Sequence, residues 1–463
     1  MRTPIPAFDE APSTSEERSS GGGGASPSAA KPPAGEPSVN ELVDSLFRRE
    51  FGALTASLVR RLGPRHVALA EDSVQQAMLQ ALRTWPFAGV PRQPTAWLRQ
   101  VARNRALDYL RRRGVWAQKE EVLQRQLRRV EVPEGEQRVL ESEGESLQDD
   151  ELRLLFLCCH PALSSSSRVA LTLKVAAGFS AREISRAYLV AESTVAQRLV
   201  RARRTLRRLG DESVWGPGDD GWATAVEERR STVLEALYSL FNAGYNAHEG
   251  DQLIRQDLCR EALRLVRCLA LHPRFGDPSA HALASLMAFQ SSRLPARQRG
   301  AQAGEVCWVP LAEQDRGRWD RRLVRRGFEH LAAASAGNEL TVYHLEAAIA
   351  SHHAGATSWE ETPWGEILAL YDQLLILRPS PVVRLNRVVA LAAVEGVELA
   401  LAELRGAWAE ELDSYHWLHA TAAHLMAEAG DSPGARERLQ RALECEMSEP
   451  ERRLLSRRLE ELS

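Results

Sequence analysis

The 463-residue sequence lacks the features that define several large classes of protein. No apolar run approaches the roughly 20 residues that a membrane-spanning helix needs, and residues 1–10 lack the apolar core of a signal peptide. Six cysteines in so long a chain fit reduced thiols better than a disulfide framework. Neither a glycine-rich phosphate loop nor a Ser/His/Asp arrangement occurs, so we predict no catalytic residue and no cofactor. We therefore expect a cytoplasmic protein that is not an enzyme and has no membrane partner.

One short pattern has the composition of a metal site. Cys158, Cys159 and His160 are consecutive. Adjacent side chains on a helix point about 100° apart, and structural zinc needs four ligands at a recognisable spacing. Because no second Cys/His pair lies nearby, we predict no metal and interpret the cysteines as core thiols at the end of a helix.

The net charge of −3 conceals two basic blocks and an acidic block between them. Residues 95–113 carry six arginines against Asp108 alone. Residues 168–208 carry ten basic residues against two glutamates. Between the two blocks, residues 131–151 contain nine acidic residues and one arginine. The two basic blocks predict two polyanion-binding surfaces, although each block alone also fits a solvated helix face.

Apolar residues recur at helical spacing over almost all of the chain beyond residue 40, so the predicted fold class is all-α. The first 40 residues are rich in Ser, Gly, Pro and Ala, which predicts a disordered tail. Breaks in composition then divide the chain into a helical domain (41–115), an acidic linker (116–150), a second helical domain (151–211) and a helical extension (225–463).

Local signals predict where the helices of the first domain begin and end. Gly63-Pro64 is expected to end the first helix and Pro86 to end the second. Thr95 is the expected cap of the third helix. In that helix Trp97, Val101, Leu107 and Leu110 are expected to pack inward.

The last hundred residues contain a weak repeat. Gly396 and Gly430 lie 34 positions apart, and each follows an Ala-rich helical segment and precedes a second amphipathic one. This is the period of tetratricopeptide units, paired helices that bury their faces by stacking. A generic helical bundle is the alternative.

The strongest local pattern is a helix-turn-helix. Ser180 and Glu183 have the spacing of a capping box at the start of a short helix, and residues 189–191 form the turn. In the second helix Val195, Leu199 and Ala202 are expected to face inward. A helix in this position presents its first residues to major-groove base edges, where Arg and Gln suit guanine and adenine. An ordinary helical hairpin is the alternative.

The second pattern covers residues 97–113. Arg99, Arg103 and Asn104 can face nucleic acid from one helix, and aromatic side chains beside arginines can stack on unpaired bases. The alternative is that Trp97 and Tyr109 belong to the core and that the arginines form a solvated face.

Taken together, these motifs resemble those of the sigma-70 family. Residues 71–77 and 96–108 resemble region 2, and the helix-turn-helix resembles region 4. The chain has no room for region 1 or region 3 domains, so it resembles the extracytoplasmic-function subclass. Residues 152–163 and further motifs at 240–245, 257–262, 314–320, 346–349, 370–372 and 380–386 resemble the group with a long tetratricopeptide-like C-terminal extension.

The resemblance assigns roles to matching positions. The polymerase-binding residues would be Glu71, Asp72, Gln75 and Gln76, which dock on the clamp-helix coiled coil of the largest subunit of core RNA polymerase. The residues that hold the −10 element as single-stranded DNA would be Trp97, Arg99, Arg103, Asn104, Asp108 and Arg111. The residues that bind the −35 element would be Ser193, Thr194, Gln197, Arg198, Arg201, Arg203 and Arg204. The loop at residues 86–94 gives no residue-level prediction.

The predicted function is that of a sigma factor that binds core RNA polymerase and promoter DNA. Its extension is expected to regulate or scaffold activity and to offer its repeats to a regulatory protein. Deleting residues 225–463 should then alter transcription without removing the −10 and −35 contacts. The alternative is a helix-turn-helix regulator whose C-terminal half senses a ligand or protein.

Overall fold

The computed structural model describes residues 39–112, 150–188, 190–209, 219–245, 256–299 and 307–462. Almost all of the predicted tail (1–40) and of the predicted acidic linker (116–150) lies outside these residues. The described chain is helical apart from one sheet, in which β1 (Gln298–Arg299) pairs antiparallel with β2 (Cys307–Trp308). The predicted all-α class is confirmed. No helix within the described ranges is both long enough and apolar enough to span a bilayer.

The first domain contains α1 (Val39–Leu62), a 3₁₀ turn η1 (Pro64–His66), α2 (Val67–Ala88) and α3 (Pro94–Arg112). Gly63 ends α1 as predicted and has a φ of 87°, a conformation that glycine adopts without strain. The prediction that Pro86 ends the second helix is wrong, because Pro86 lies within the last turn of α2 and Gly89, with a φ of 82°, follows the helix. Pro94 begins α3, so Thr95 is inside the helix rather than its cap.

The buried face of α3 differs from the predicted one by one position. Leu98, Ala102, Ala106 and Leu110 are buried, at a spacing of four residues, whereas Trp97, Val101 and Leu107 are only partly buried. The two alanines have no bulk beyond Cβ, so α3 can lie close to α2. Leu110 is the one position that the prediction and the structure share.

The second domain contains a helix at residues 150–158, α6 (Ser165–Leu171), a π-helical turn η3 (Thr172–Ala176), α7 (Ala181–Ala187) and α8 (Glu192–Leu209). The predicted capping box is present: Ser180 Oγ accepts from the Glu183 amide at 3.1 Å, and the Glu183 carboxylate accepts from the Ser180 amide at 2.8 Å. Helix α8 begins at Glu192, directly after the predicted turn. The helix-turn-helix is therefore where the sequence predicts it.

The C-terminal extension begins with α9 at Asp219, inside the predicted break in composition. Its helices are α9 (Asp219–Tyr245), α10 (Gln256–Ala270), α11 (Pro278–Ser292), α12 (Arg321–Ala334), α13 (Val342–Gly355), α14 (Trp364–Leu377), α15 (Pro381–Glu395), α16 (Val397–Glu403), α17 (His416–Glu428), α18 (Ser432–Glu444) and α19 (Glu449–Glu461). Short 3₁₀ turns η4 (Leu294–Ala296), η5 (Leu311–Glu313), η6 (Arg316–Arg318) and η7 (Ala407–Leu412) connect some of them.

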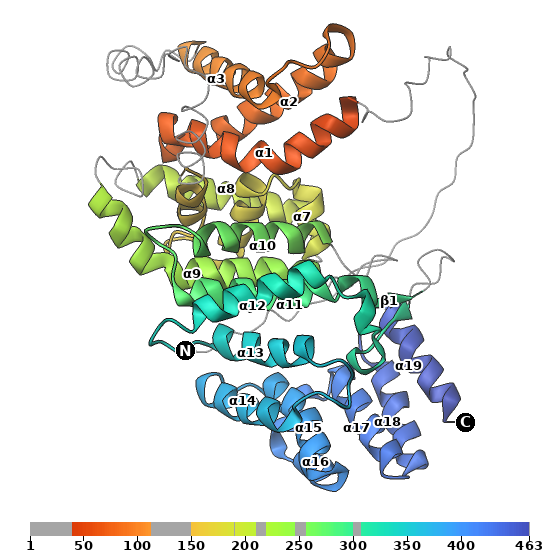
Figure 1. Ribbon diagram of the computed structural model, residues 1–463. Coiled ribbons are helices and arrows are strands. Elements are labelled where there is room, and N and C mark those ends of the chain that lie inside the picture. The colour runs from red at the N-terminus through yellow and green to blue at the C-terminus, as the bar shows by residue number, and fades with distance from the viewer. Residues whose placement is uncertain are drawn as a thin grey trace, which may run out of the picture.

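The three parts of the chain follow one another along the molecule (Figure 1). Helices α1–α3 lie at one end, α7–α10 in the middle and α14–α18 at the other end. One buried cluster nevertheless runs from Val43 of α1 to Ala354 of α13. Smaller cores hold α13–α15 and α17–α19 together. The first two domains and the first half of the extension thus share a continuous apolar core.

The two glycines of the predicted repeat occupy matching places. Gly396 separates α15 from α16 with a φ of 98°, and Gly430 precedes α18 with a φ of 84°. Helix pairs α15–α16 and α17–α18 pack against each other in sequence order. Helix α16 has only seven residues, so the two pairs are unequal.

Candidate nucleic-acid and polymerase interface

Three arginines meet where α1 ends beside α3. The pKa of Arg61 is lowered, first by burial and then by the positive charges of Arg103 and Arg99. The carboxylate of Asp150 opposes this shift, and an anion such as a phosphate would interact favourably with the same guanidinium groups. The sequence singled out Arg99 and Arg103 but missed Arg61, whose only local signal is the pair Arg60-Arg61 at the end of a helix.

The other predicted −10 residues lie along the same helix. Asn104 is exposed and accepts a hydrogen bond from Gln100 at 3.2 Å. Asp108 and Arg111 are exposed, and Arg111 Nη1 lies 3.6 Å from Asp108 Oδ1. Trp97 is half-buried, and its ring meets that of buried Trp85 edge-on at 5.4 Å between centroids. Trp97 therefore belongs in part to the core, and its stacking on unpaired bases stays a prediction.

The sequence also missed an exposed aromatic side chain at the end of α2. Phe87 lies at the end of α2 and is 92% exposed, the highest value among the exposed large hydrophobic residues that the structure describes. Val90 in the following loop is 40% exposed. An apolar ring held in solvent by a proline-containing helix end is a ready surface for stacking. The signal was the dipeptide Pro86-Phe87 in a loop that gave no residue-level prediction.

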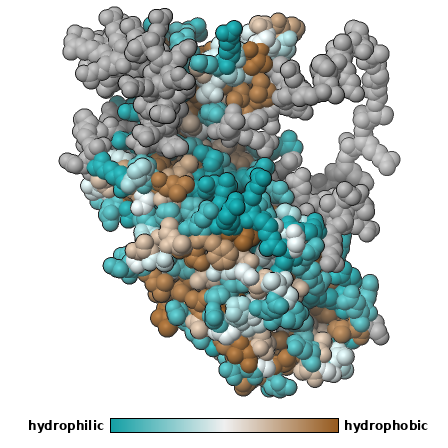
Figure 2. All heavy atoms as spheres, in the orientation of Figure 1, coloured by the Kyte–Doolittle hydropathy of each residue, from teal (hydrophilic) through white to brown (hydrophobic). Residues whose placement is uncertain are grey.

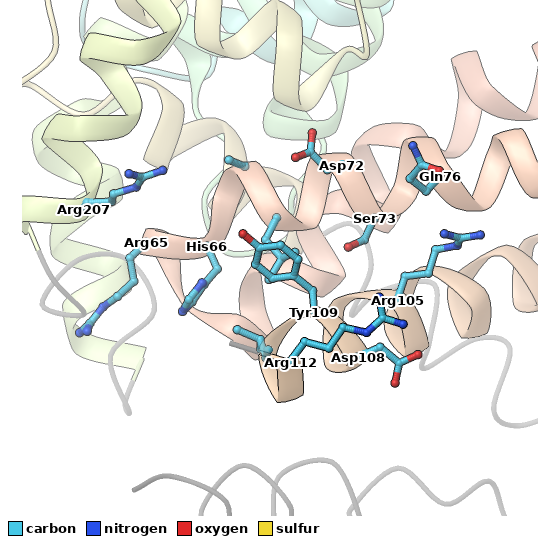
Figure 3. A pocket seen from close by; sticks show the side chains of 13 residues that line it. Arg65, His66, Asp72, Ser73, Gln76, Arg105, Asp108, Tyr109, Arg112 and Arg207 are labelled. Carbon is cyan, nitrogen blue, oxygen red and sulfur yellow. The ribbon is translucent and has the colours of Figure 1, made fainter. Parts of the chain in front are cut away.

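Two of the predicted polymerase-binding residues line a cavity of about 780 Å³ (Figure 3). Asp72 and Gln76 of α2 line it together with Asp108 of α3 and Arg207 of α8. The remaining lining residues are Arg65, His66, Ala68, Leu69, Ser73, Arg105, Tyr109, Leu110 and Arg112. The cavity therefore joins predicted polymerase-binding and −10 residues to the helix-turn-helix.

The four predicted polymerase-binding residues do not share one environment. Asp72 and Gln76 are exposed, and Gln75 is half-buried. Glu71 is 2% exposed and accepts a hydrogen bond from Gln75 at 3.3 Å. It also pairs with Lys174 at 3.2 Å and with Arg203. In this conformation Glu71 lies between the two domains.

Helix α8 presents most of its predicted −35 residues to solvent. Val195, Leu199, Ala202 and Leu206 form its buried face. On the opposite face, Ser193, Gln197, Arg201 and Arg204 are exposed, and Thr194 and Arg198 are half-exposed. Arg203 lies on the flank of the helix, where its guanidinium donates to Glu71. The structure thus brings six of the seven predicted residues to one accessible side and turns the seventh toward α2.

The predicted core thiols are buried as expected. Cys158 and Cys159 are both fully buried, and burial raises the pKa of the Cys159 thiol to about 12. Among the residues that the structure describes, no group of three or more His, Cys, Asp or Glu side chains is placed to hold a metal ion.

Both helical domains match models of known protein families. The model of sigma-70 region 2 matches residues 47–115, and the model of sigma-70 region 4 matches residues 153–206. The chain belongs to the sigma-70 family. Its domains are those of an RNA polymerase sigma factor of the extracytoplasmic-function type, which binds core RNA polymerase and promoter DNA. The sigma-70 family is not a family of enzymes.

The extension of this sigma factor also has relatives. Residues 229–335, which run from within α9 past the end of α12, match a family of unknown function, DUF6596. An uncharacterized protein of Rhizobium meliloti (strain 1021) is 37% identical over 381 residues, which cover 82% of this chain and 86% of that protein. No solved structure matches the chain. The predicted resemblance to sigma factors that carry a long C-terminal extension is confirmed, because this chain has such an extension.

Proposed function

We propose that this sigma factor melts and holds the −10 element with α3 and the end of α2, and reads the −35 element with α8. The observation that carries the proposal is the pair of exposed, arginine-bearing helices contributed by region 2 and region 4 of one chain. Phosphate contacts fix the register of a protein on DNA, and contacts with bases give specificity.

In region 2, Arg61, Arg99 and Arg103 bind phosphates of the unpaired strand. Phe87 and the open side of Trp97 stack on its bases, an interaction worth roughly 1–3 kcal/mol per base. Asn104 and Asp108 are exposed and offer hydrogen bonds to base edges. Support comes from the cation cluster and from the 92% exposure of Phe87.

In region 4, the exposed face of α8 enters the major groove. Gln197 and Arg201 lie one turn apart near the middle of that face, where they read base edges. Ser193 and Thr194 bind at the start of the helix, and Arg198 and Arg204 bind phosphates.

Core polymerase binds α2. Asp72 and Gln76 are exposed together on one side of this helix, which gives an acidic and polar surface for a basic partner. The resemblance identifies that partner as the clamp helices of the largest subunit.

Co-elution of the purified chain with core RNA polymerase tests the proposal. We expect a stable complex, and we expect the double substitution Asp72→Lys/Gln76→Lys to weaken it roughly tenfold, since close charge pairs across an interface contribute about 1.5 kcal/mol or more. Glu398→Lys on exposed α16 is the control and should leave the complex intact. Tight binding of duplex operator without any affinity for polymerase would instead identify a helix-turn-helix regulator.

We further propose that the extension scaffolds region 4. Trp222 of α9 is buried and meets Phe156 of region 4 edge-on at 5.1 Å and Phe275 at 5.4 Å. The Tyr188 hydroxyl, at the end of α7, donates to the carbonyl of Ser239 at 3.4 Å. Deleting the chain from α9 onward, Trp222 included, would expose Phe156 and its apolar neighbours to water. Unlike the deletion of residues 225–463, this deletion should destabilise region 4 as well as alter transcription.

Trp222→Ala tests the scaffold in the full chain. The loss of a buried tryptophan should lower the free energy of unfolding by about 3–5 kcal/mol and weaken binding of a −35 duplex. If Trp222→Ala and a chain that ends at residue 209 both melt like the wild type, the extension is not a scaffold.

The far end of the extension has apolar side chains for a regulatory protein. Ile376 and Leu377 of α14, Val394 of α15 and Leu399 of α16 are between 43% and 79% exposed. Hydrophobic residues appear over the end of the molecule where these helices lie (Figure 2). Ile376→Glu should change transcription in cells and leave transcription with purified core polymerase unchanged. Equal activity in cells would argue against such a partner.

A further inference from the structure

Helix α12 of the extension has a strongly basic exposed face. Four of its first six residues are arginines, and the preceding turn η6 contributes another at its end. All five are exposed: Arg318, Arg321, Arg322, Arg325 and Arg326. Among the residues that the structure describes, Arg325 alone of these five has an ion-pair partner, Glu329 at 3.9 Å, and that pair is itself exposed. The face therefore carries positive charge that the fold leaves largely unneutralised.

Packing against α11 fixes the direction in which this face points. The four arginines of α12 form two pairs with a spacing of four positions, so they make adjacent rows on one side of the helix, with about 5–6 Å between Cβ atoms in a row. On the other side, Gly327 lies so close to α11 that a Cβ there would come within 2.5 Å of the Phe289 ring. Its carbonyl also accepts from Ser285 Oγ at 2.8 Å. Hydrophilic residues gather at the middle of the molecule, where α10 and α12 lie (Figure 2).

Two of the arginines are placed where their charge weakens the helix. The first turn of α12 contains no acidic residue, and Arg321 and Arg322 lie there, at the positive end of the helix dipole. The cap residue Asp320 offsets part of this repulsion, since its carboxylate accepts from the Arg322 amide at 2.8 Å. Cations that weaken their own helix are better explained by an anion outside the chain than by a role in the fold.

Duplex DNA held by region 4 is a polyanion within reach of this face. One buried cluster includes Phe156 of region 4 and Ala334 of α12, so α12 has a fixed place relative to α8. Packed helices lead from α8 through α6, α9 and α11 to α12, and at roughly 8–10 Å per packed pair α12 lies within about 40 Å of α8. Figure 1 shows α10 between the two helices. Two turns of a duplex cover about 70 Å, so DNA that leaves α8 is long enough to pass α12.

We propose that the basic face of α12 binds phosphates of duplex DNA upstream of the −35 element. The extension then adds a third DNA contact to those of regions 2 and 4. This inference rests on the proposed function of α8, because that helix sets where the duplex lies. Arginine suits the role, since its planar guanidinium can bind a phosphate through two hydrogen bonds. Such contacts contribute affinity and salt dependence but do not read the base sequence.

Two duplexes of different length test this contact with the full chain. The short probe contains the −35 element, and the long probe adds about 20 base pairs, two helical turns, upstream of it. We expect the long probe to bind more tightly, and the slope of log affinity against log salt to be steeper by about three to four, because each of four phosphate contacts adds about 0.9. Fluorescence anisotropy at several salt concentrations measures both slopes.

Arg322→Gln/Arg326→Gln should reduce the slope for the long probe by about two and leave the short probe unchanged. Arg453→Gln/Arg457→Gln on α19 is the matched control. These two arginines pair with Glu449 and Glu461 at 3.3 and 3.4 Å, so the chain itself neutralises their charges, and binding of both probes should stay at the wild-type level. The α12 variant loses only exposed side chains, and its melting temperature should be no lower than that of the wild type.

Three results would overturn the proposal. A wild-type slope for the long probe in the α12 variant would show that α12 does not touch the duplex. An equal loss on both probes would show that the arginines act through the −35 contact. Weaker binding of core polymerase with both slopes unchanged would identify an acidic protein surface as the partner instead.

A long duplex of random sequence separates this inference from the proposed function. If α8 does not read the −35 element, the random duplex and the promoter duplex bind the wild type equally, and the proposed function of α8 fails. The difference in salt slope between the wild type and the α12 variant on the random duplex still decides whether α12 binds DNA.

Discussion

Arg264 of the extension forms a two-pronged salt bridge with Glu151 at the start of region 4. Arg264 Nη1 donates to Glu151 Oε2 at 2.9 Å, and Nη2 donates to Oε1. The preceding residue, Asp150, accepts from Arg60 of region 2 at 3.0 Å. Two consecutive carboxylates thus join region 4 to the extension on one side and to region 2 on the other.

Removing Arg264 should destabilise the whole chain. Burial alone would lower the pKa of Arg264, but hydrogen bonds with Glu261 and Glu151 raise it, which shows how strongly the charged form is held. Arg264→Ala leaves both carboxylates unneutralised, and we expect the free energy of unfolding to fall by roughly 3 kcal/mol. Chemical denaturation measures the change. Arg325→Ala, which breaks an exposed pair at 3.9 Å, should cost less than about 0.5 kcal/mol. Equal losses in the two variants would contradict this account of the junction.

Phe87→Ala should impair promoter melting without affecting stability. The side chain is 92% exposed, so its removal costs little in the folded chain, whereas loss of one stacked base should slow open-complex formation roughly tenfold. Permanganate reactivity of unpaired thymines follows the melting. Ile376→Ala, at a position 79% exposed in the extension, is the control for losing an exposed apolar side chain. If the Phe87→Ala variant melts the promoter as the wild type does, Phe87 does not belong to the surface that binds the −10 element.

Substitutions at two residues of α8 should impair DNA binding in different ways. Gln197→Ala should reduce discrimination between −35 sequences by about 1–3 kcal/mol, because a base contact is lost. Arg204→Ala should weaken binding to all sequences and lower the salt slope by about one, because a phosphate contact is lost. Anisotropy titrations of duplexes at several salt concentrations separate the two effects. Arg453→Ala on α19 controls for a lost surface arginine. Identical profiles for the two α8 variants would refute this division of roles.

Acid should weaken the extension through His330. Its Nδ1 lies 2.9 Å from Nδ1 of His281, and burial, together with His281 and nearby arginines, lowers the pKa of His330 to about 4. The folded state therefore favours the neutral ring, so its contribution to stability is complete above about pH 6.5 and is lost as the pH falls toward 4. When the pH falls from 7 to 5, the free energy of unfolding of the wild type decreases. In His330→Gln this decrease should be smaller by on the order of 1–2 kcal/mol. Parallel pH dependences in thermal denaturation would exclude His330 as the cause.

Local chemistry made parts of this fold predictable. The helix-turn-helix follows from Ser180, Glu183 and the apolar spacing of α8, all within 30 residues. Gly63 marks the end of α1 because its backbone needs a positive φ. These signals come from residues that lie close together in the chain, so the sequence alone is enough to predict the structure that they form.

Errors arose where packing chooses between similar local options. In α3 two apolar stripes one position apart are available, and contact with α2 selects the one with small alanines. Pro86 is a helix breaker by its local chemistry, but in the last turn of α2 it interrupts little, and the helix continues to Ala88.

The environment of Glu71 could not be read from sequence at all. Its partners lie 103 and 132 positions along the chain, at Lys174 and Arg203, and they reach it only when two domains dock. Phe87 was equally hidden, since its exposure depends on where α2 ends. The predicted roles of Glu71 and its neighbours Asp72, Gln75 and Gln76 in polymerase binding stay predictions.

Run-off transcription with purified core polymerase tests the central claim most directly. The full chain should convert core polymerase into an enzyme that starts at a defined position on a promoter identified by start-site mapping after overexpression, and Arg99→Ala/Arg103→Ala should abolish that start. Transcripts that begin at the same positions with and without the chain would contradict its assignment as a promoter-directing sigma factor.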